Sequence, residues 1–240
     1  MSPLRVPRAH SHPCGTCPVR RSFCPLPEDL GAVFDSLKTS AAYRKGEVVF
    51  QETDPCDHVF VVCEGALKLV TASSEGKVLL LRCAGPGEIL GVAEAVLGEH
   101  APYECSAIAA ERSVVAIVPR ETFMRFVRFY PEACVRMTVA LSEQYRASQR
   151  EERFLAFGGT STARLIHLLL GWSAERGDVL ADGVRIPSHF TQTELAQSIG
   201  STRETVTRIL GDLDRRGIME RTPDEIVIRS AEEMVRLAAH

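Results

Sequence analysis

The sequence predicts an α+β protein with a β-rich N-terminal part, one long central helix and a mostly helical C-terminal part. Between Ala42 and Pro119, short runs of Val, Ile and Leu recur, separated by turn signals such as Gly85-Pro86-Gly87. Strands at such regular spacing are typical of an antiparallel sandwich or barrel. We expect boundaries that divide the chain into residues 1–25, 26–130, 131–157 and 158–240.

The composition is that of an ordinary globular chain, with 240 residues, 45% of them hydrophobic, and a net charge of −3. No apolar run approaches the roughly 18 residues of a membrane span. Residues 1–14 lack the apolar core of a secretory signal. We therefore expect a cytoplasmic protein with no membrane partner. Since the sequence has no phosphate-binding loop, serine-hydrolase or zinc-protease motif, we do not expect an enzyme.

A long helix is predicted at residues 131–157, which contain neither glycine nor internal proline. Pro131 suits the first turn of a helix. An apolar stripe along it consists of Val135, Val139, Leu141 and Tyr145. A helix of this length needs a partner surface. It either packs against its own copy in a homodimer or lies on its own β-rich domain.

The segment 190–230 predicts two short helices joined by a turn at Gly200. Thr191-Gln192-Thr193-Glu194 has the pattern of a capping box, which starts a helix. Ser201-Thr202-Arg203-Glu204 repeats this pattern and predicts the start of the second helix. Two helices in this arrangement form a helix-turn-helix. A hairpin around residues 222–224 would add a wing.

The second helix carries polar side chains at its N-terminal end, the end that reaches base edges in the major groove. Arginine can pair with guanine and glutamate can accept from cytosine. A solvated charged face is the alternative. The candidate base-reading residues are Arg203, Glu204, Thr207 and Arg208. The candidate DNA-backbone contacts are Thr191, Gln192, Thr202 and Thr205.

The segments TQTELAQSIG and GSTRETVTRILGDLDRRGIM resemble the helix-turn-helix of the CRP/FNR family of transcription regulators. The β-rich segment, with glycines at positions 65, 76, 87 and 91, resembles that family's cyclic-nucleotide-binding-type β-roll, a jelly roll. The resemblance covers about residues 27–230. It implies a β-roll sensor, a dimerisation helix and a C-terminal winged helix-turn-helix. It also implies a homodimer that binds double-stranded DNA and acts with RNA polymerase.

Cyclic-AMP receptors of this family resemble one another in a Gly-Glu pair followed by an Arg-Ser pair that holds the cyclic phosphate. Here Val92 follows Gly91, and Cys105-Ser106 stands where the Arg-Ser pair is expected. No arginine occurs between Arg82 and Arg112. A buried phosphate would lack its bidentate cation. We therefore expect that the chain does not bind a cyclic nucleotide.

Cys14, Cys17 and Cys24, called the N-terminal cysteines below, resemble the cluster-binding segment of FNR-type oxygen sensors. Three thiolates can hold three corners of a [4Fe–4S] cluster. A structural zinc site and a thiol redox switch are the alternatives. The other five cysteines are scattered and are expected to be mostly small buried hydrophobes.

The fourth cluster ligand departs from the FNR pattern, because the position that carries it in those proteins falls on Ala116. Our candidate is Cys105, since strand alternation would place it on the same face as Ala107, the expected neighbour of Ala116. Cys83, Cys63 and a non-cysteine ligand are the fallbacks.

Together these features predict a DNA-binding regulator that senses oxygen or redox state. A regulator that responds to a small ligand or to thiol oxidation, and a cofactor-independent one, are the alternatives. The reading end Arg203-Glu204-Thr205-Val206-Thr207-Arg208 is similar to that of the cyclic-AMP receptors. The resemblance therefore implies an inverted repeat with TGTGA-like half-sites, rather than the TTGAT typical of FNR.

Overall fold

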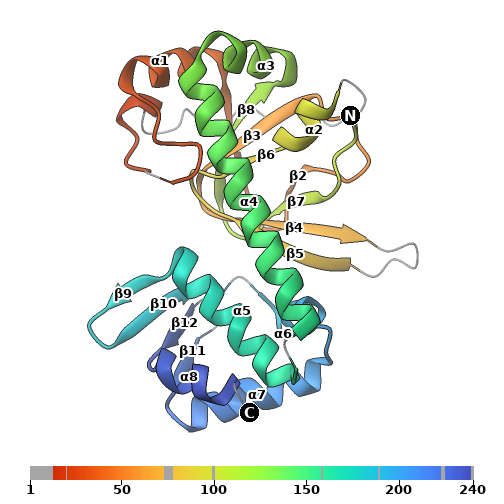
Figure 1. The fold of residues 1–240 in the computed structure, drawn as a ribbon, viewed down its shortest axis with the longest axis vertical. Coiled ribbons are helices and arrows are strands. Elements are labelled where there is room, and N and C mark those ends of the chain that lie inside the picture. Colours follow the sequence, from red (N-terminus) through yellow and green to blue (C-terminus); the bar gives the residue numbers. More distant parts are fainter. Residues whose placement is uncertain are drawn as a thin grey trace. The chain divides into compact units, whose positions relative to one another are not determined.

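The computed structural model describes residues 13–19, 21–72, 78–98, 101–157, 159–188, 190–222 and 225–238. The chain divides into two compact units, Met1–Arg146 and Ala147–His240. Helices and antiparallel sheets occur in both units, so the predicted α+β class is confirmed (Figure 1). Among the described residues, no helix is both long enough and apolar enough to span a membrane.

The first unit is built on two four-stranded antiparallel sheets. One sheet has the order β1 (Thr39–Tyr43), β8 (Ser113–Pro119), β3 (His58–Glu64) and β6 (Ile89–Leu90). The other has the order β2 (Val48–Phe50), β7 (Ser106–Ala109), β4 (Leu67–Ala72) and β5 (Val78–Ala84). Their apolar side chains share one core, in which the ring of Phe50 stacks on those of Phe60 and Tyr103. The antiparallel β architecture predicted from the strand spacing, and the jelly roll that the family resemblance implied, are confirmed.

Helices frame this roll: α1 (Glu28–Leu37), α2 (Val92–Leu97), α3 (Arg120–Phe129) and the first part of α4 (Pro131–Phe157). The apolar run at residues 88–93 is a strand only at Ile89–Leu90 (β6) and continues as a helix. The backbone leaves the sheet after Leu90 because Gly91 has a φ of 77°, and α2 begins at the next residue. This left-handed turn is accessible to glycine at little cost.

The segment before α1 is held on the roll by Phe23, whose side chain is fully buried. Its ring lies 5.4 Å from that of Phe34 and 5.9 Å from that of Phe123. The Phe23 amide donates to the carbonyl of Gly87 at 3.2 Å. A side chain at Gly87 would place its Cβ 2.6 Å from the Arg21 carbonyl oxygen, so only glycine allows this close approach. The described part of this segment therefore belongs to the core of the first unit.

Helix α4 has the bounds predicted from the sequence and has two different faces within the first unit. On one face Ala133 and Ala140 are fully buried, and the Gln144 side chain donates to the Ile89 carbonyl at 2.7 Å. Leu141, expected at a dimer seam, packs partly buried against the roll instead. The other three residues of the predicted stripe remain exposed: Val135, Val139 and Tyr145.

The second unit contains α5 (Ser161–Arg176), α6 (Gln192–Ser198), α7 (Arg203–Arg215) and α8 (Ala231–Ala238) around one sheet. Its strand order is β11 (Met219–Arg221), β12 (Glu225–Ile228), β10 (Gly183–Pro187) and β9 (Asp178–Leu180). The turn between β9 and β10 consists of Ala181 and Asp182, because Gly183 already pairs with Leu180. A Cβ at Gly183 would lie 2.3 Å from the Ile228 carbonyl oxygen on β12.

Candidate nucleic-acid interface and cysteine site

Helix α6 begins at the predicted capping box. The Thr191 hydroxyl accepts from the Glu194 amide at 3.2 Å, and the Thr191 amide donates to the Glu194 carboxylate at 2.8 Å. Two N–H groups that a helix start leaves without partners are satisfied in this way. The turn that follows includes Gly200 at a φ of 59°. This predicted capping box is confirmed.

The second predicted capping box is wrong, because α7 is capped one residue later than expected. The Thr202 hydroxyl accepts from the Thr205 amide at 3.2 Å. Ser201 closes the turn instead: its amide donates to the Ala196 carbonyl at 2.8 Å, and its hydroxyl to the Ser161 hydroxyl at 3.1 Å. Helix α7 still begins at Arg203, so the shift does not move the reading residues out of its first two turns.

Helix α7 separates a buried face from an exposed one. Val206, Ile209, Leu210 and Leu213 are buried in the core of the second unit. The four candidate base-reading residues are all exposed: Arg203, Glu204, Thr207 and Arg208. These four side chains, called the reading residues below, are thus brought together on the solvent side of the N-terminal half of α7, where a helix-turn-helix meets base edges.

A polar bridge connects α6, α7 and the wing strand β11. The Gln192 amide, oriented so that its nitrogen donates to the Thr207 hydroxyl at 2.6 Å, has its oxygen 3.1 Å from Arg221. The Thr207 hydroxyl donates in turn to the Arg203 carbonyl at 2.8 Å. Gln192, a candidate backbone contact, is therefore engaged within the protein. The sequence analysis missed Arg221; its position at the end of the first wing strand was the available signal.

The other three backbone candidates lie at the two helix starts. Thr191 and Thr202 are exposed, whereas Thr205 is half-buried and its hydroxyl accepts from that of Thr202 at 3.0 Å. Two of the three hydroxyls therefore remain accessible beside the N-termini of α6 and α7. Helix N-termini favour anions such as phosphate.

The N-terminal cysteines lie in the short helix η1 (Cys14–Thr16) and the segment that follows it. Cys17 is buried, and Cys14 and Cys24 are half-buried. Burial, and then the negative charges that Cys63, Cys14 and Cys17 would carry, raise the pKa of the Cys24 thiol. Burial likewise raises the pKa of Cys63 to about 12, and the charges of Cys14 and Cys17 contribute to this rise. The fold therefore places Cys63, on β3, within electrostatic range of the N-terminal cysteines.

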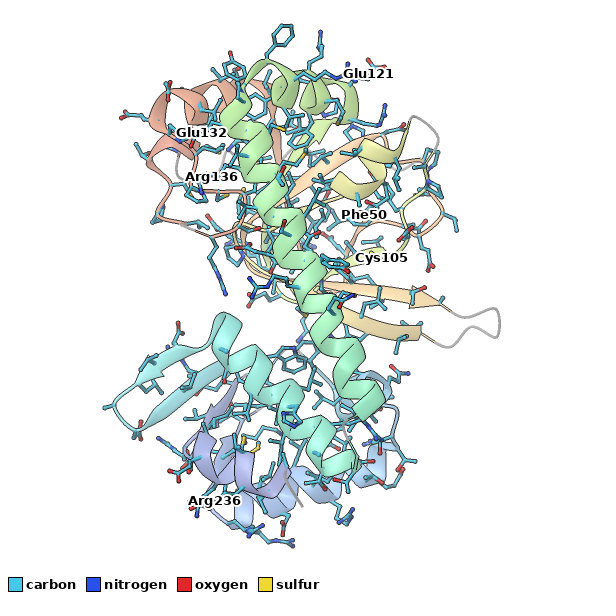
Figure 2. The ribbon with its side chains drawn as sticks, in the orientation of Figure 1. Phe50, Cys105, Glu121, Glu132, Arg136 and Arg236 are labelled. Atoms are coloured by element: carbon cyan, nitrogen blue, oxygen red, sulfur yellow. The ribbon has the colours of Figure 1, made fainter. Side chains whose placement is uncertain are left out.

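Cys105 has a different set of neighbours. Burial, and then the charge of Glu94, raise the pKa of its thiol to about 11; Arg82 and Glu52 are the next groups that act on it. In Figure 2, Cys105 lies to the right of α4, whereas the red N-terminal segment lies to the left. The structure thus does not bring Cys105 together with the N-terminal cysteines.

Cys105 was proposed as the fourth ligand because Ala107 was expected to lie beside Ala116, and the strand pairing shows that it does not. Ala107 lies on β7 and pairs with Phe50 and Leu69, whereas Ala116 lies on β8 in the other sheet and pairs with Ser40 and Val61. Ala107 is therefore not a strand neighbour of Ala116. The two strands that lie beside Ala116 are β1 and β3, and β3 carries Cys63. Sequence alternation could not reveal this, because it does not say which strands share a sheet.

Lys38 and Asp35 form a partly buried ion pair beside Cys14. The Lys38 ammonium lies 2.7 Å from the Asp35 carboxylate and donates to the Cys14 sulfur at 2.9 Å. The other Asp35 oxygen accepts from the Cys14 amide at 2.7 Å. Burial alone would lower the pKa of Lys38, but the hydrogen bonds to Asp35 and Cys14 outweigh it and raise that pKa. The same pair of partners, Lys38 and the Cys14 amide, lowers the pKa of Asp35 against the opposing effect of burial.

No three donors among the described His, Cys, Asp and Glu residues converge as a site for one metal ion. For a single zinc ion, ligand sulfurs would have to stand about 2.3 Å from one common point. A [4Fe–4S] cluster carries its four thiolates on four separate irons and spreads them farther apart. Thiolates are ligands of both zinc and iron–sulfur clusters, so the donor set of the N-terminal cysteines and Cys63 fits either group in its chemistry.

Two family models match the chain: the cyclic nucleotide-binding domain over residues 41–130 and the Crp-like helix-turn-helix domain over residues 163–237. The chain belongs to the CRP/FNR family of transcription regulators. The members of this family bind DNA through the helix-turn-helix and are not enzymes. The predicted family, fold and non-enzymatic, DNA-binding function are confirmed.

Curated relatives of this CRP/FNR protein span most of its length. A CRP-like cAMP-activated global transcriptional regulator of Mycobacterium tuberculosis is 25% identical over 82% of this chain and 86% of its own. The transcriptional activator protein anr of Pseudomonas aeruginosa is 24% identical over 97% of this chain and 94% of its own. The structure of FixK2 from Bradyrhizobium japonicum superposes with a TM-score of 0.72 at 21% identity, covering 83% of this chain and 96% of that one. This last likeness concerns the fold alone.

The stretch that corresponds to the phosphate-binding cassette of the cyclic-AMP receptors has other partners in this CRP/FNR protein. Val92, in place of glutamate, is buried at the start of α2. Arg82 is 2.5 Å from the Glu88 carboxylate, which also accepts from the Gly85 amide at 2.9 Å. Arg82, the arginine that precedes this stretch, is therefore neutralised by a carboxylate of its own domain.

Proposed function

We propose that this CRP/FNR regulator senses oxygen or redox state through a [4Fe–4S] cluster held by the N-terminal cysteines and Cys63. Cys63 replaces Cys105 as the fourth ligand. The observation that supports this is that Cys14 and Cys24 pack against the same apolar core to which Cys63 belongs, although Cys63 follows them by 49 and 39 residues in sequence. When bound, the cluster supplies a centre that oxidants can convert or destroy.

The surroundings of these cysteines favour the binding of a cationic centre. Burial raises the pKa of the thiols of Cys14, Cys24 and Cys63, so these three are held as thiols and do not ionise readily without a compensating cation. A bound iron–sulfur core provides that compensation, because its ligands must be thiolates. Binding would release protons and order the segment around Cys14.

A conformational change at the cysteine site could be transmitted toward the DNA-binding unit through Phe23, which precedes Cys24 in sequence. The Phe23 ring packs in a tilted arrangement against Phe34 of α1 and Phe123 of α3, and the Phe34 ring lies 5.5 Å from that of Phe126 on α3. Helices α1 and α3 contact each other within the first unit (Figure 1). Since α3 runs directly into α4, we propose that ordering of the cysteine segment biases α4 toward a DNA-competent dimer. Loss of the cluster would reverse this bias.

The homodimer in this proposal uses the exposed face of α4, with Val135, Val139 and Tyr145. These side chains are 60%, 38% and 66% exposed in the single chain, although they are apolar or aromatic. A two-fold dimer would bury them and present two copies of α7 about one helical turn of DNA apart, roughly 34 Å.

The proposed DNA site is an inverted repeat with TGTGA-like half-sites. Arg203 and Arg208 would each face a guanine, and Glu204 a cytosine. The Thr207 hydroxyl already donates to the Arg203 carbonyl, which leaves its methyl group to contact a thymine methyl. Thr191 and Thr202 would hold phosphates near the helix N-termini. RNA polymerase as a partner stays a prediction from the family.

The test is metal and sulfide analysis of full-length protein purified without air, followed by DNA binding before and after exposure to air. We expect iron and sulfide in equal amounts, a brown colour, and a DNA affinity that falls with the colour. Cys24→Ser should remove both the colour and the response to air. Stoichiometric zinc would contradict the cluster and indicate a structural metal site. Metal-free protein with unchanged DNA affinity would indicate a cofactor-independent regulator, and a response to peroxide alone a thiol switch.

A further inference from the structure

A lysine that is almost completely buried stands against the first of the N-terminal cysteines. The Lys38 side chain is 7% exposed, and Asp35 beside it is 25% exposed. Lysine is almost never buried without a partner, and a buried ion pair is weak support for stability because of its desolvation cost. The position of this pair therefore calls for a role other than holding the fold together.

The pair is oriented relative to the cysteine site. The ammonium of Lys38 donates to the Cys14 sulfur at 2.9 Å, so the positive end of the pair faces the thiol. The carboxylate of Asp35 holds the amide of Cys14 at 2.7 Å and the ammonium at 2.7 Å. The result is an oriented dipole whose cation, rather than its anion, touches a proposed cluster ligand.

The influence of Lys38 extends beyond Cys14. Its positive charge also acts on Cys24 and on Cys63, where it opposes the effect of burial on each thiol. The Lys38 ammonium thus contacts the thiol of Cys14 on η1 and acts through its charge on the thiols of Cys24 and Cys63. In surroundings of low dielectric constant, the interaction energy between two charges at this range is much larger than in water.

We propose that Lys38 is a charge-tuning residue of the cysteine site, whose ammonium stabilises the more negative, reduced form of the bound cluster. This inference rests on the proposed function. Reduction at an electrode adds one electron, and therefore one negative charge, to a site that already carries four thiolates. The adjacent ammonium favours that state and raises the reduction potential. Asp35 positions the ammonium and, as a second charge of opposite sign, partly offsets it.

The experiment is protein-film voltammetry of full-length, cluster-loaded protein prepared without air. Lys38→Gln keeps a donor but removes the charge, and should shift the one-electron potential to a more negative value. Lys38→Arg keeps the charge and should stay close to the parent. Asp35→Asn keeps an acceptor for the Cys14 amide but removes the negative charge, and should shift the potential in the opposite direction to Lys38→Gln. Lys45→Gln, at an exposed lysine of the same unit, is the matched control and should leave the potential unchanged.

Opposite shifts for Lys38→Gln and Asp35→Asn support the proposal, since a merely structural ion pair would not give effects of opposite sign. Equal potentials in the loaded variants, or the same sign for both, would overturn it and leave the proposed function intact. If Lys38→Gln fails to hold the cluster, Asp35→Asn and Lys38→Arg decide the question alone. Iron-free parent protein would contradict the proposed function itself and is distinguished by metal analysis before any voltammetry.

Discussion

The helix-turn-helix and the cysteine site are built on different length scales. The cap of α6 joins Thr191 to Glu194, and the cap of α7 joins Thr202 to Thr205, so each bond closes over three residues of sequence. The proposed cysteine site would instead join η1 to β3, so it depends on which strands share a sheet. A site built from local contacts can be located from sequence, whereas a site built across sheets requires the topology.

The largest effect is expected where the cysteine segment is anchored. Phe23→Ala removes a fully buried ring and should cost about 3–5 kcal/mol of stability in the first unit. All cysteines would remain, but the segment that presents them would lose its anchor. Urea unfolding followed by circular dichroism, together with anaerobic iron content, should show both losses. Phe129→Ala, at a phenylalanine that is 78% exposed, is the control and should change neither. A stable Phe23→Ala protein with full iron would refute the anchoring role.

The two faces of α4 predict two different outcomes for the same kind of substitution. Val139→Arg would bury an unpaired charge at the proposed seam and should weaken the dimer by about 3–5 kcal/mol without unfolding the chain. Leu141→Arg should instead destabilise the roll, because Leu141 packs against it. Light scattering separates dimer from monomer, and thermal unfolding reports the roll. Val179→Arg, at an exposed valine of β9, is the matched control. An intact dimer in Val139→Arg, or a monomeric parent, would contradict the proposed seam.

In helix α7, Arg203→Ala should weaken the free energy of binding to the preferred DNA site by about 1–3 kcal/mol. It should also relax the sequence preference at one base pair. The reason is the loss of one bidentate contact to guanine, while the phosphate contacts remain. Selection from a random DNA pool, run in parallel on both proteins, gives the two motifs. Arg236→Ala on α8, which removes an exposed charge of the same unit, should leave the motif unchanged. Identical motifs from the parent and Arg203→Ala would show that Arg203 does not read a base.

Individual residues show which features could be predicted from the sequence and which could not. The strand spacing, the bounds of α4 and the exposure of the reading residues were predictable, because periodicity and caps are local properties. The cap of α7 was placed one residue early, because Ser201 and Thr202 both have hydroxyls and only the folded turn engages Ser201 with Ala196 and Ser161. The alternation of side chains along β7 shows which residues share a face of that strand. It does not show that Ala107 and Ala116 belong to different sheets. Lys38 and Arg221 were missed because their partners come from other elements.

The smallest effect tests the corrected cap. Thr202→Ala should lower the free energy of unfolding by about 1 kcal/mol, the usual contribution of an N-cap hydroxyl. Ser201→Ala should cost less if Thr202 is the cap, since the Ser201 amide bond to Ala196 would remain. Thermal unfolding of the two variants, compared side by side, provides the measurement. The reverse order of the two losses would restore the cap at Ser201.

The central claim is that a strand of the β-roll completes the site begun by the N-terminal cysteines, and iron content tests it most directly. Cys63→Ser and Cys105→Ser remove one half-buried or buried thiol each from the same unit, so they form a matched pair. In protein purified without air, we expect Cys105→Ser to keep the iron, sulfide and colour of the parent, and Cys63→Ser to lose them while circular dichroism shows an intact roll. A full cluster in Cys63→Ser together with its loss in Cys105→Ser would contradict the account.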